Sequence, residues 1–336
     1  MGRKSHTKTL YCSMNGFPVG DLYLKNGRIS FKYSPDWLEV EGSRAISLSM
    51  PMQRAEISGD AVHAYFDNLL PDTGAIREHM KDQFGADSAN PFDLLAKIGK
   101  DCVGALTFTE TPATGGVPSL TLTPLSEGEL AQIIRDTRFE KMLGMHSGDD
   151  FRISLAGAQE KTALTLWRGK WCRPHGSTPT THIFKPPILH HESLGLDVAN
   201  CDIAQFEDQK VLVVERFDRK VESDVILRLP QEDICQALGK VSGSKYEEQG
   251  GPGSQEVTKL LSGSRNAYKD RLEFLRVQIV YWLLAAIDGH AKNFSITLNQ
   301  DGYRLAPFYD VLSAYPYFGQ GRTTITSIFT GSQYAF

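Results

Sequence analysis

The stretch between residues 270 and 310 constrains the fold of this chain more than any other part of the sequence. From Asp270 to about Ile287 the spacing is that of a long helix, with apolar residues at Leu272, Leu275, Ile279, Leu283 and Ala286. A polar loop, Asp288-Gly-His-Ala-Lys-Asn293, follows directly. Two apolar stretches, Phe294–Leu298 and Tyr303–Phe308, then flank a turn sequence, which predicts a hairpin. We therefore expect the polar loop to lie between a buried helix and a hairpin.

The polar loop and the residue that follows the hairpin form the strongest candidate for a catalytic site. Asp288 and Asn293 have the Asp-x-x-x-x-Asn spacing of the catalytic loop of protein kinases. In that chemistry a carboxylate accepts the proton of the substrate hydroxyl, and an amide oxygen holds Mg²⁺ beside the transferred phosphate. Asp310 can bring a second carboxylate to the same place. The simpler alternative is that Asp288 caps the helix, His290 and Lys292 face solvent, and Asp310 begins a turn.

Three further segments carry residues that suit a nucleotide site. Arg152–Lys161 holds small residues whose backbone N–H groups can approach an anion. Lys185 ends an apolar strand, the position from which a kinase lysine pairs with ATP phosphates. Val213–Asp218 is a strand that runs into polar residues, as expected of a hinge beside an adenine. The alternatives are an ordinary loop, a solvated lysine, and an edge strand in which Glu215 or Asp218 pairs with a neighbouring arginine.

The remaining elements are predicted from local patterns. Asn-Gly pairs at residues 15–16 and 26–27 predict a three-stranded meander over residues 10–33. Helices are expected at residues 60–70, 73–84, 91–98, 125–143 and 230–238, and strands at 103–109, 164–167, 182–184 and 211–215. The Thr/Pro/Gly-rich stretch 111–118 is the best internal linker. This order predicts a strand-rich lobe followed by a helical lobe.

Composition excludes several function classes. With 36 Lys and Arg against 40 Asp and Glu, the net charge is −4, so bulk positive charge is not available to hold nucleic acid. The five cysteines are widely spaced and form no C-x-x-C pair, which argues against a disulfide framework or a zinc site. The sequence contains neither H-E-x-x-H nor G-x-S-x-G. Its longest apolar run is too short to cross a bilayer, so we expect a soluble intracellular protein.

Six ordered motifs resemble the HipA family, serine/threonine-kinase toxins of bacterial toxin–antitoxin pairs. They are Phe151-Arg-Ile-Ser-Leu-Ala-Gly-Ala-Gln-Glu-Lys-Thr-Ala-Leu164, Thr180-Thr-His-Ile-Phe-Lys-Pro186, Val214-Glu-Arg-Phe-Asp-Arg219, Leu229-Pro-Gln-Glu-Asp-Ile-Cys235, Asp288-Gly-His-Ala-Lys-Asn-Phe-Ser295 and Pro307-Phe-Tyr-Asp310. The N-terminal half is similar to the family in Phe31–Trp37, Leu48–Pro51 and Phe66–Asp72. The resemblance implies an α+β, two-lobed protein-kinase-like fold with an N-terminal β-rich subdomain. The expected division is residues 1–145 for that subdomain, 146–218 for the ATP-binding part of the small lobe, and 219–336 for the helical catalytic lobe.

The resemblance also implies cofactors, ATP and Mg²⁺, and roles for individual residues. Asp288 is implied as the catalytic base, Asn293 and Asp310 as the Mg²⁺ ligands, and Ser154 as a residue whose autophosphorylation silences the kinase. The implied ATP-binding residues are Ala156, Gly157, Ala158, Gln159, Glu160 and Lys161 in a phosphate loop, Lys185 at the phosphates, Glu215, Arg216 and Phe217 at the adenine hinge with Gln231 nearby, and His290, Ala291, Lys292, Asn293, Tyr309 and Asp310 beside the nucleotide.

The family's partners are implied in the same way. They are a small HipB-like helix-turn-helix antitoxin, operator DNA bound through the toxin–antitoxin complex, and glutamyl-tRNA synthetase, whose phosphorylation causes growth arrest and persistence. We expect a cytoplasmic protein, associated with the nucleoid when bound to the antitoxin, and no membrane partner.

Two features depart from the family's pattern, and two other functions compete with the kinase. The connection at residues 189–193 is shorter than the family's, and the sequence ends at Phe336, which should leave the long helix partly uncovered. One alternative function is a repressor subunit that binds antitoxin and DNA and in which kinase activity is incidental. The other is a metal-dependent phosphatase, which gives Lys185 and the hinge no role.

Overall fold

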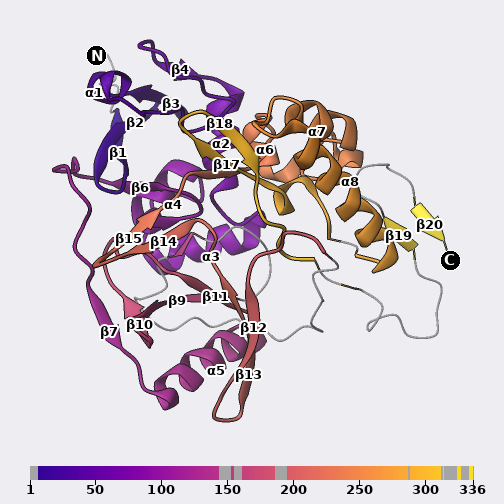
Figure 1. Cartoon of the computed structure of the whole chain (residues 1–336). Helices are drawn as coiled ribbons and strands as arrows, with labels where there is room; N and C mark the ends of the chain where they lie inside the picture. Colours follow the sequence, from indigo (N-terminus) through magenta and orange to yellow (C-terminus); the bar gives the residue numbers. More distant parts are fainter. Residues whose placement is uncertain are drawn as a thin grey trace.

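Three packed parts follow one another along the chain (Figure 1). The computed structural model describes residues 7–143, 153–154, 161–185, 195–286, 288–311, 313, 324–326 and 333–335. Among the helices of these residues, none is long and apolar enough to span a bilayer.

The N-terminal part is an antiparallel five-stranded sheet, in the order β4-β3-β2-β1-β6, with helices packed against it. Its elements are β1 (Lys8–Met14), β2 (Phe17–Lys25), β3 (Arg28–Tyr33), α1 (Pro35–Glu39), β4 (Ile57–Ser58), α2 (Asp60–Asn68), α3 (Gly74–Phe84), α4 (Pro91–Ile98) and β6 (Leu106–Thr109). The predicted meander is confirmed, because both Asn-Gly pairs take the positive φ angles of tight hairpin turns. In the core, the ring of Phe66 packs against those of Phe31 and Phe108.

The middle part is a six-stranded antiparallel sheet, in the order β12-β13-β11-β9-β10-β7, followed by a hairpin. Its elements are β7 (Leu122–Pro124), α5 (Glu127–Leu143), β9 (Thr162–Trp167), β10 (Lys170–Pro174), β11 (His182–Lys185), β12 (Cys201–Phe206), β13 (Gln209–Glu215), and the hairpin strands β14 (Arg219–Glu222) and β15 (Val225–Arg228). Helix α5 packs against β12 and β13, and its Leu130 and Ile134 share a core with Phe184 and Phe206.

This packing bears on the domain division. A boundary at residue 145 would assign β7 and α5 to the N-terminal part, although both belong to the middle sheet and its core. Residues 111–118 connect β6 to β7 without helix or strand, as expected of a linker. We therefore propose this linker as the first boundary. A short parallel pair, β5 (Asp101–Cys102) with β8 (Ile153–Ser154), still joins the two parts.

The C-terminal part combines a three-stranded sheet, β16-β17-β18, with a group of helices. Its elements are β16 (Gln231–Asp233), α6 (Ile234–Ala237), α7 (Ser254–Leu261), α8 (Ala267–Leu283), β17 (Ser295–Asn299), β18 (Gly302–Leu305), the hairpin β19 (Thr324–Thr326) and β20 (Gln333–Ala335), and the 3₁₀ turns η1 (Ser242–Ser244), η2 (Glu247–Gln249) and η3 (Ala291–Asn293). The hairpin predicted after the polar loop is confirmed as β17 and β18.

The helix predicted at residues 230–238 is wrong over its first half. Gln231–Asp233 is a strand that pairs with β17, and only Ile234–Ala237 is helical. The reason is the cap: the carboxylate of Asp233 accepts a hydrogen bond from the backbone N–H of Gln236. A helix-capping residue has an extended backbone, so the helix cannot begin before it.

Helix α8 is confirmed, but the face that it buries differs from the expected one. Its residues Phe274, Val277 and Tyr281 are buried, and the rings of Phe274 and Tyr281 pack against Phe294. Four residues of the expected stripe are instead 43–60% exposed: Leu272, Leu275, Ile279 and Leu283. Both faces of the helix are apolar, so spacing identifies the helix without identifying the face that packs. The expectation of a partly uncovered helix holds for the described residues.

The N-terminal and C-terminal parts meet where α2 packs against α6 (Figure 1). Glu232 of β16 is fully buried at this contact, and its Oε1 accepts a hydrogen bond from the backbone N–H of Leu48 at 2.9 Å. Its Oε2 is buried with no hydrogen-bond partner among the described residues. Burial raises the pKa of Glu232 to about 8, so the folded protein holds a neutral acid here.

We expect Glu232→Gln to remove a pH dependence from folding stability. The unfolded chain releases the Glu232 proton above about pH 4.5, whereas the folded protein keeps it until about pH 8. Raising the pH through this window therefore favours the unfolded state and should lower the wild-type free energy of unfolding by roughly 2–4 kcal/mol. Urea unfolding at both ends of the window measures the change. Equal pH slopes in wild type and variant would contradict a buried neutral acid.

Candidate active site

A cleft of about 360 Å³ receives residues from all three parts of the chain. The predicted site residues that line it are Lys161, Lys185, Glu215, Arg216, Phe217, Gln231, Asp288, His290, Lys292, Asn293, Tyr309 and Asp310. Ala291 is instead buried in the core of the C-terminal part. Residues 156–160 and the side chain of Ser154 lie outside the described residues, so their expected roles stay predictions.

An ion pair between Lys185 and Asp310 lies in this cleft. Lys185 is the last residue of β11, and its side chain is only 8% exposed. Burial alone would favour the neutral acid, but the positive charges of Lys185 and Lys161 hold the pKa of Asp310 below its usual value. Burial, with the charge of Lys185, lowers the pKa of Lys161 to about 8. The cleft therefore holds a carboxylate that stays ionised beside two lysines.

The polar loop folds back on itself around Asp288. The amide of Asn293 donates a hydrogen bond to the backbone carbonyl of Asp288, which brings the two residues together. The hydroxyl of Tyr246 donates to Asp288 Oδ1 at 3.2 Å, and His290 Nε2 lies 3.5 Å from the same oxygen. The Asp288 side chain is 44% exposed, so it can reach a substrate. Burial lowers the pKa of His290 to about 4, although Asp288 opposes the change, and the imidazole is neutral at physiological pH.

Lys292, from the same loop, points toward the N-terminal part. Its ammonium donates hydrogen bonds to Asn68 and to the carboxylate of Asp233. The alternative that His290 and Lys292 face solvent is therefore wrong, because both side chains are buried. The ammonium of Lys292 is hydrogen-bonded to protein acceptors. This bonding does not favour the expected role of Lys292 at the nucleotide.

The hinge is held by a buried network of charges centred on Asp101 of β5. Three arginine nitrogens lie near its carboxylate, at 3.4 Å for Arg216 Nη1, 3.0 Å for Arg219 Nη2 and 3.1 Å for Arg228 Nη2. Asp218 pairs with Arg216 at 2.8 Å and with Arg219 at 2.9 Å. Burial would raise the pKa of Asp101, but the three guanidinium groups hold it well below its usual range.

This network confirms the salt bridge of one alternative from the sequence, between Asp218 and a neighbouring arginine. The edge strand of that alternative is wrong, because β13 lies between β12 and β11. The network also means that the guanidinium of Arg216 serves the junction between two parts of the chain. The side chain is 5% exposed, and its hydrogen-bond partners among the described residues are Asp101, Asp218, Thr180 and the carbonyl of Cys102. If Arg216 contacts a nucleotide, its main chain does so.

Part of the cleft lining is apolar. The apolar side chains that line the cleft include Val103, Ile183, Ala199, Val214 and Phe217. The ring of Phe217 lies 5.9 Å from that of Tyr309, with an angle of 33° between the planes. The backbone N–H groups of Glu215 and Arg216 are already bonded, to the carbonyls of Asn200 and Thr181. Gln231 lines the cleft nearby, and its Oε1 is buried without a hydrogen-bond partner among the described residues.

The cleft also contains residues that the sequence analysis did not single out. Among them are Asn68 and Asp72 of the N-terminal part, Asp233 of β16, and Lys245 and Tyr246 after η1. Asp72 pairs with Lys245 at 2.9 Å. Asn68 and Asp72 belong to the stretch 66–72, which is similar to the family in sequence. That similarity pointed to the stretch, but it implied no role for these two residues.

Comparisons with known proteins place the chain in a family. Residues 153–334 match the HipA-like C-terminal domain, and residues 10–109 match the HipA N-terminal domain. "Putative kinase Y4mE" of Sinorhizobium fredii is 35% identical over 314 residues, covering 87% of this chain and 74% of that protein. The serine/threonine-protein kinase toxin HipA of Shewanella oneidensis is 29% identical, covering 92% of this chain and 76% of that protein.

A solved structure matches as well. In the complex of Shewanella oneidensis MR-1 HipA, HipB and operator DNA, a chain matches with a TM-score of 0.77 and 27% identity, covering 93% of this chain and 78% of that chain. The present chain belongs to the HipA family, and the expected α+β, kinase-like fold is confirmed. The family supports kinase activity in general. The N-terminal match ends at residue 109, in agreement with a boundary at the 111–118 linker.

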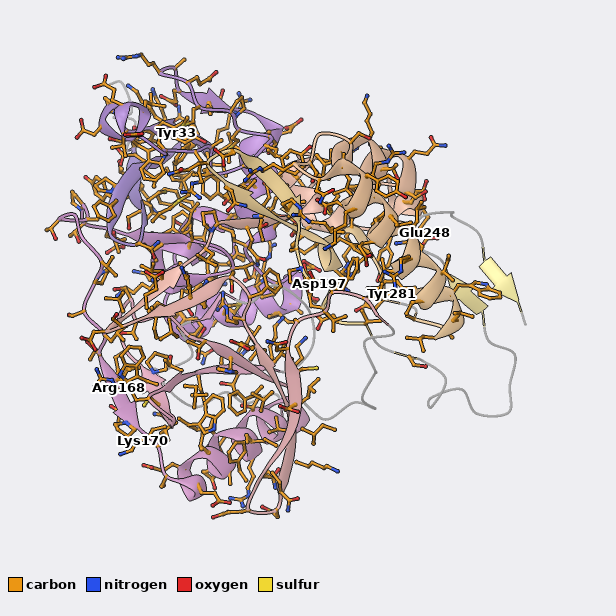
Figure 2. All side chains as sticks on the ribbon, viewed as in Figure 1. Tyr33, Arg168, Lys170, Asp197, Glu248 and Tyr281 are labelled. Atoms are coloured by element: carbon orange, nitrogen blue, oxygen red, sulfur yellow. The ribbon has the colours of Figure 1, made fainter. Side chains whose placement is uncertain are left out.

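We expect Asp101→Asn to destabilise the protein by roughly 3–5 kcal/mol, because three buried guanidinium groups would lose their shared counter-charge. Urea unfolding followed by tryptophan fluorescence measures the effect. Arg168→Ala is the matched control, since Arg168 lies in the turn between β9 and β10 (Figure 2). It pairs with Asp224 of the β14–β15 turn, and both side chains are more than 70% exposed. That control should change stability by less than about 0.5 kcal/mol. An Asp101→Asn protein as stable as the control would contradict the network's role.

Proposed function

We propose that the cleft binds ATP with Mg²⁺ and that the protein transfers the γ-phosphate to a serine or threonine hydroxyl. The observation that carries this proposal is that two sets of charged and polar groups line the same cleft. The Lys185–Asp310 pair and the Asp288–Asn293 loop line the same cleft, although they come from three separate stretches of sequence. Phosphoryl transfer requires mainly that such groups be positioned around the phosphate.

Asp288 is the proposed base. Its carboxylate is partly exposed, is held by Tyr246, and lies beside a neutral His290 that does not neutralise its charge. A carboxylate in this position accepts the proton of the substrate hydroxyl as the oxygen attacks the phosphate. The neutral state of His290 also means that this side chain adds no positive charge beside Asp288 at physiological pH.

Asn293 and Asp310 are the proposed Mg²⁺ ligands, and their chemistry fits this ion. Asn293 uses its Nδ2 to bind the Asp288 carbonyl, so its Oδ1 is the atom left for a cation. Asp310 stays ionised, because two lysines hold its pKa low. Mg²⁺ is typically bound by one or two protein oxygens together with substrate phosphates, rather than by a closed protein cage. When bound, the ion neutralises phosphate charge.

The rest of the cleft fits ATP in two ways. Lys185 and Lys161 supply positive charge for the phosphates, and by resemblance residues 156–160 form the phosphate loop. The apolar part of the lining, which includes Phe217 and Val214, suits an adenine ring. The buried Oε1 of Gln231 has no hydrogen-bond partner among the residues that the structure describes, and it is an acceptor that an exocyclic amine can satisfy. We do not assign the side chains of Arg216 and Lys292 to the nucleotide, since both are bonded elsewhere.

The biological setting is proposed from the family. The similar solved structure is a complex of HipA with HipB and operator DNA. We propose that this protein is likewise a toxin that a helix-turn-helix antitoxin binds, that the pair acts as a co-repressor on its operator, and that it works in the cytoplasm. Glutamyl-tRNA synthetase is the proposed substrate, and Ser154 is the proposed site of autophosphorylation.

We expect Asp288→Asn to lower the rate of phosphoryl transfer by about 10²–10⁴-fold, the usual contribution of a general base. The dissociation constant for ATP should stay within about threefold of wild type, because the adenine and phosphate contacts remain. The measurement is incubation with Mg²⁺ and γ-labelled ATP, followed by mass spectrometry to locate the label, with Asp224→Asn as an exposed carboxylate control.

Two results would contradict the proposal. One is a transfer rate in Asp288→Asn within tenfold of wild type. The other is the absence of label in wild-type protein that starts unphosphorylated and binds ATP, which would favour the subunit that binds antitoxin and DNA without a catalytic role.

A further inference from the structure

The loop that carries the proposed base and metal ligand is anchored by a side chain between them. Lys292 Nζ donates to the backbone carbonyl of Asn68 at 3.0 Å, to Asn68 Oδ1 at 2.8 Å and to Asp233 Oδ2 at 3.3 Å. These three acceptors match the three protons of an ammonium group. Asp72 Oδ1 lies 3.5 Å from the same nitrogen and adds a second negative charge. Two of the partners, Asn68 and Asp72, belong to the N-terminal part.

Asn68 is itself held in one orientation. It is the last residue of α2 and is 2% exposed. Its Nδ2 donates to the carbonyls of Ala64 and Lys240, each at 2.7 Å, so its Oδ1 must face Lys292. The preceding residue, Asp67, accepts a hydrogen bond from the backbone N–H of Ser242 at 2.9 Å. The end of α2 is therefore fixed on both sides of its contact with the loop.

The charge of Lys292 makes this contact strong. Its side chain is 3% exposed, and the carboxylates of Asp233 and Asp72 lie 3.3 Å and 3.5 Å from its Nζ. The group is thus a buried, ion-paired cation. A buried cation that loses an acceptor either shifts toward a new one or stays unpaired at a high cost, and both outcomes disturb the loop that carries it. Tyr309 makes a further contact with this loop, because its hydroxyl donates to the Lys292 carbonyl at 2.8 Å.

We propose that Asn68 and Asp72 are positioning residues for phosphoryl transfer: through Lys292 they fix where Asp288 and Asn293 lie. The N-terminal part is then a component of the active centre. This inference rests on the proposed kinase function of the cleft. Neither residue is needed for the adenine or phosphate contacts proposed above, so their loss should affect the rate more than the binding of ATP.

The test compares Asn68→Ala with His63→Ala, an exposed residue of the same helix. A displacement of about 1 Å at the reacting groups can cost roughly 100-fold in rate, so we expect kcat to fall about 10- to 100-fold in Asn68→Ala. The dissociation constant for ATP should change by less than about threefold. His63→Ala should behave as wild type in both measurements. Asp72→Asn, which keeps the shape of the side chain, is the milder variant should Asn68→Ala fail to fold, and we expect a loss of about 3- to 10-fold.

A double-mutant cycle separates positioning from general damage. If Asn68 acts through Lys292, then Asn68→Ala should have little further effect on kcat in a Lys292→Met background. An equal loss of kcat in both backgrounds would overturn the inference, as would wild-type kcat in both Asn68→Ala and Asp72→Asn.

Hydrogen exchange of residues 288–295 tests the same inference without catalysis. Asn68→Ala should speed amide exchange in this segment by about tenfold or more relative to His63→Ala, and unchanged exchange would overturn the inference. If wild type transfers no phosphate, the proposed function fails, while the exchange experiment still decides whether Asn68 positions the loop.

Discussion

The arrangement of this protein depends on one buried carboxylate, Asp101, which three arginines surround. Two aspartates and three arginines leave the cluster with an excess positive charge, and backbone carbonyls take up the remaining guanidinium protons, among them those of Cys102, Gly104 and Thr180. Such a cluster is tolerated in the interior only while every member is paired, because each unpaired charge would face a medium of low polarity. The N-terminal part supplies Asp101 and the middle part supplies Arg216, so neither can move away without leaving charge unpaired.

The N-terminal part therefore reaches the cleft at two places. At the hinge, β5 carries Asp101 and pairs in parallel with β8, the strand that precedes the expected phosphate loop. At the polar loop, Asn68 and Asp72 hold Lys292. The N-terminal part thus contacts both the hinge beside the proposed adenine site and the proposed catalytic loop.

Local patterns predicted what depends on local geometry. The Asn-Gly turns identified the meander, and the spacing of Asp288 and Asn293 identified the loop, because both signals lie within a few residues. The prediction of a helix over residues 230–238 was wrong at its start, because Asp233 caps a helix that begins only at Ile234. The apolar residues of α8 did not reveal which face of the helix packs against the core. Two of the partners of Lys292 and Arg216, namely Asn68 and Asp101, lie more than a hundred residues away, and no sequence spacing encodes such pairs. The resemblance to the family implied that Lys292 and Arg216 both lie at the nucleotide. A resemblance in sequence gives the position of a residue along the chain, but it does not give the direction of its side chain.

This cleft is the proposed Mg²⁺ and ATP site. A crystal structure of the protein with Mg²⁺ and a non-hydrolysable ATP analogue tests it most directly. We expect the adenine beside Phe217 and Gln231, the phosphates at Lys185, and the ion on Asn293 and Asp310. A nucleotide bound outside the cleft, or an ion held by neither Asn293 nor Asp310, would contradict it.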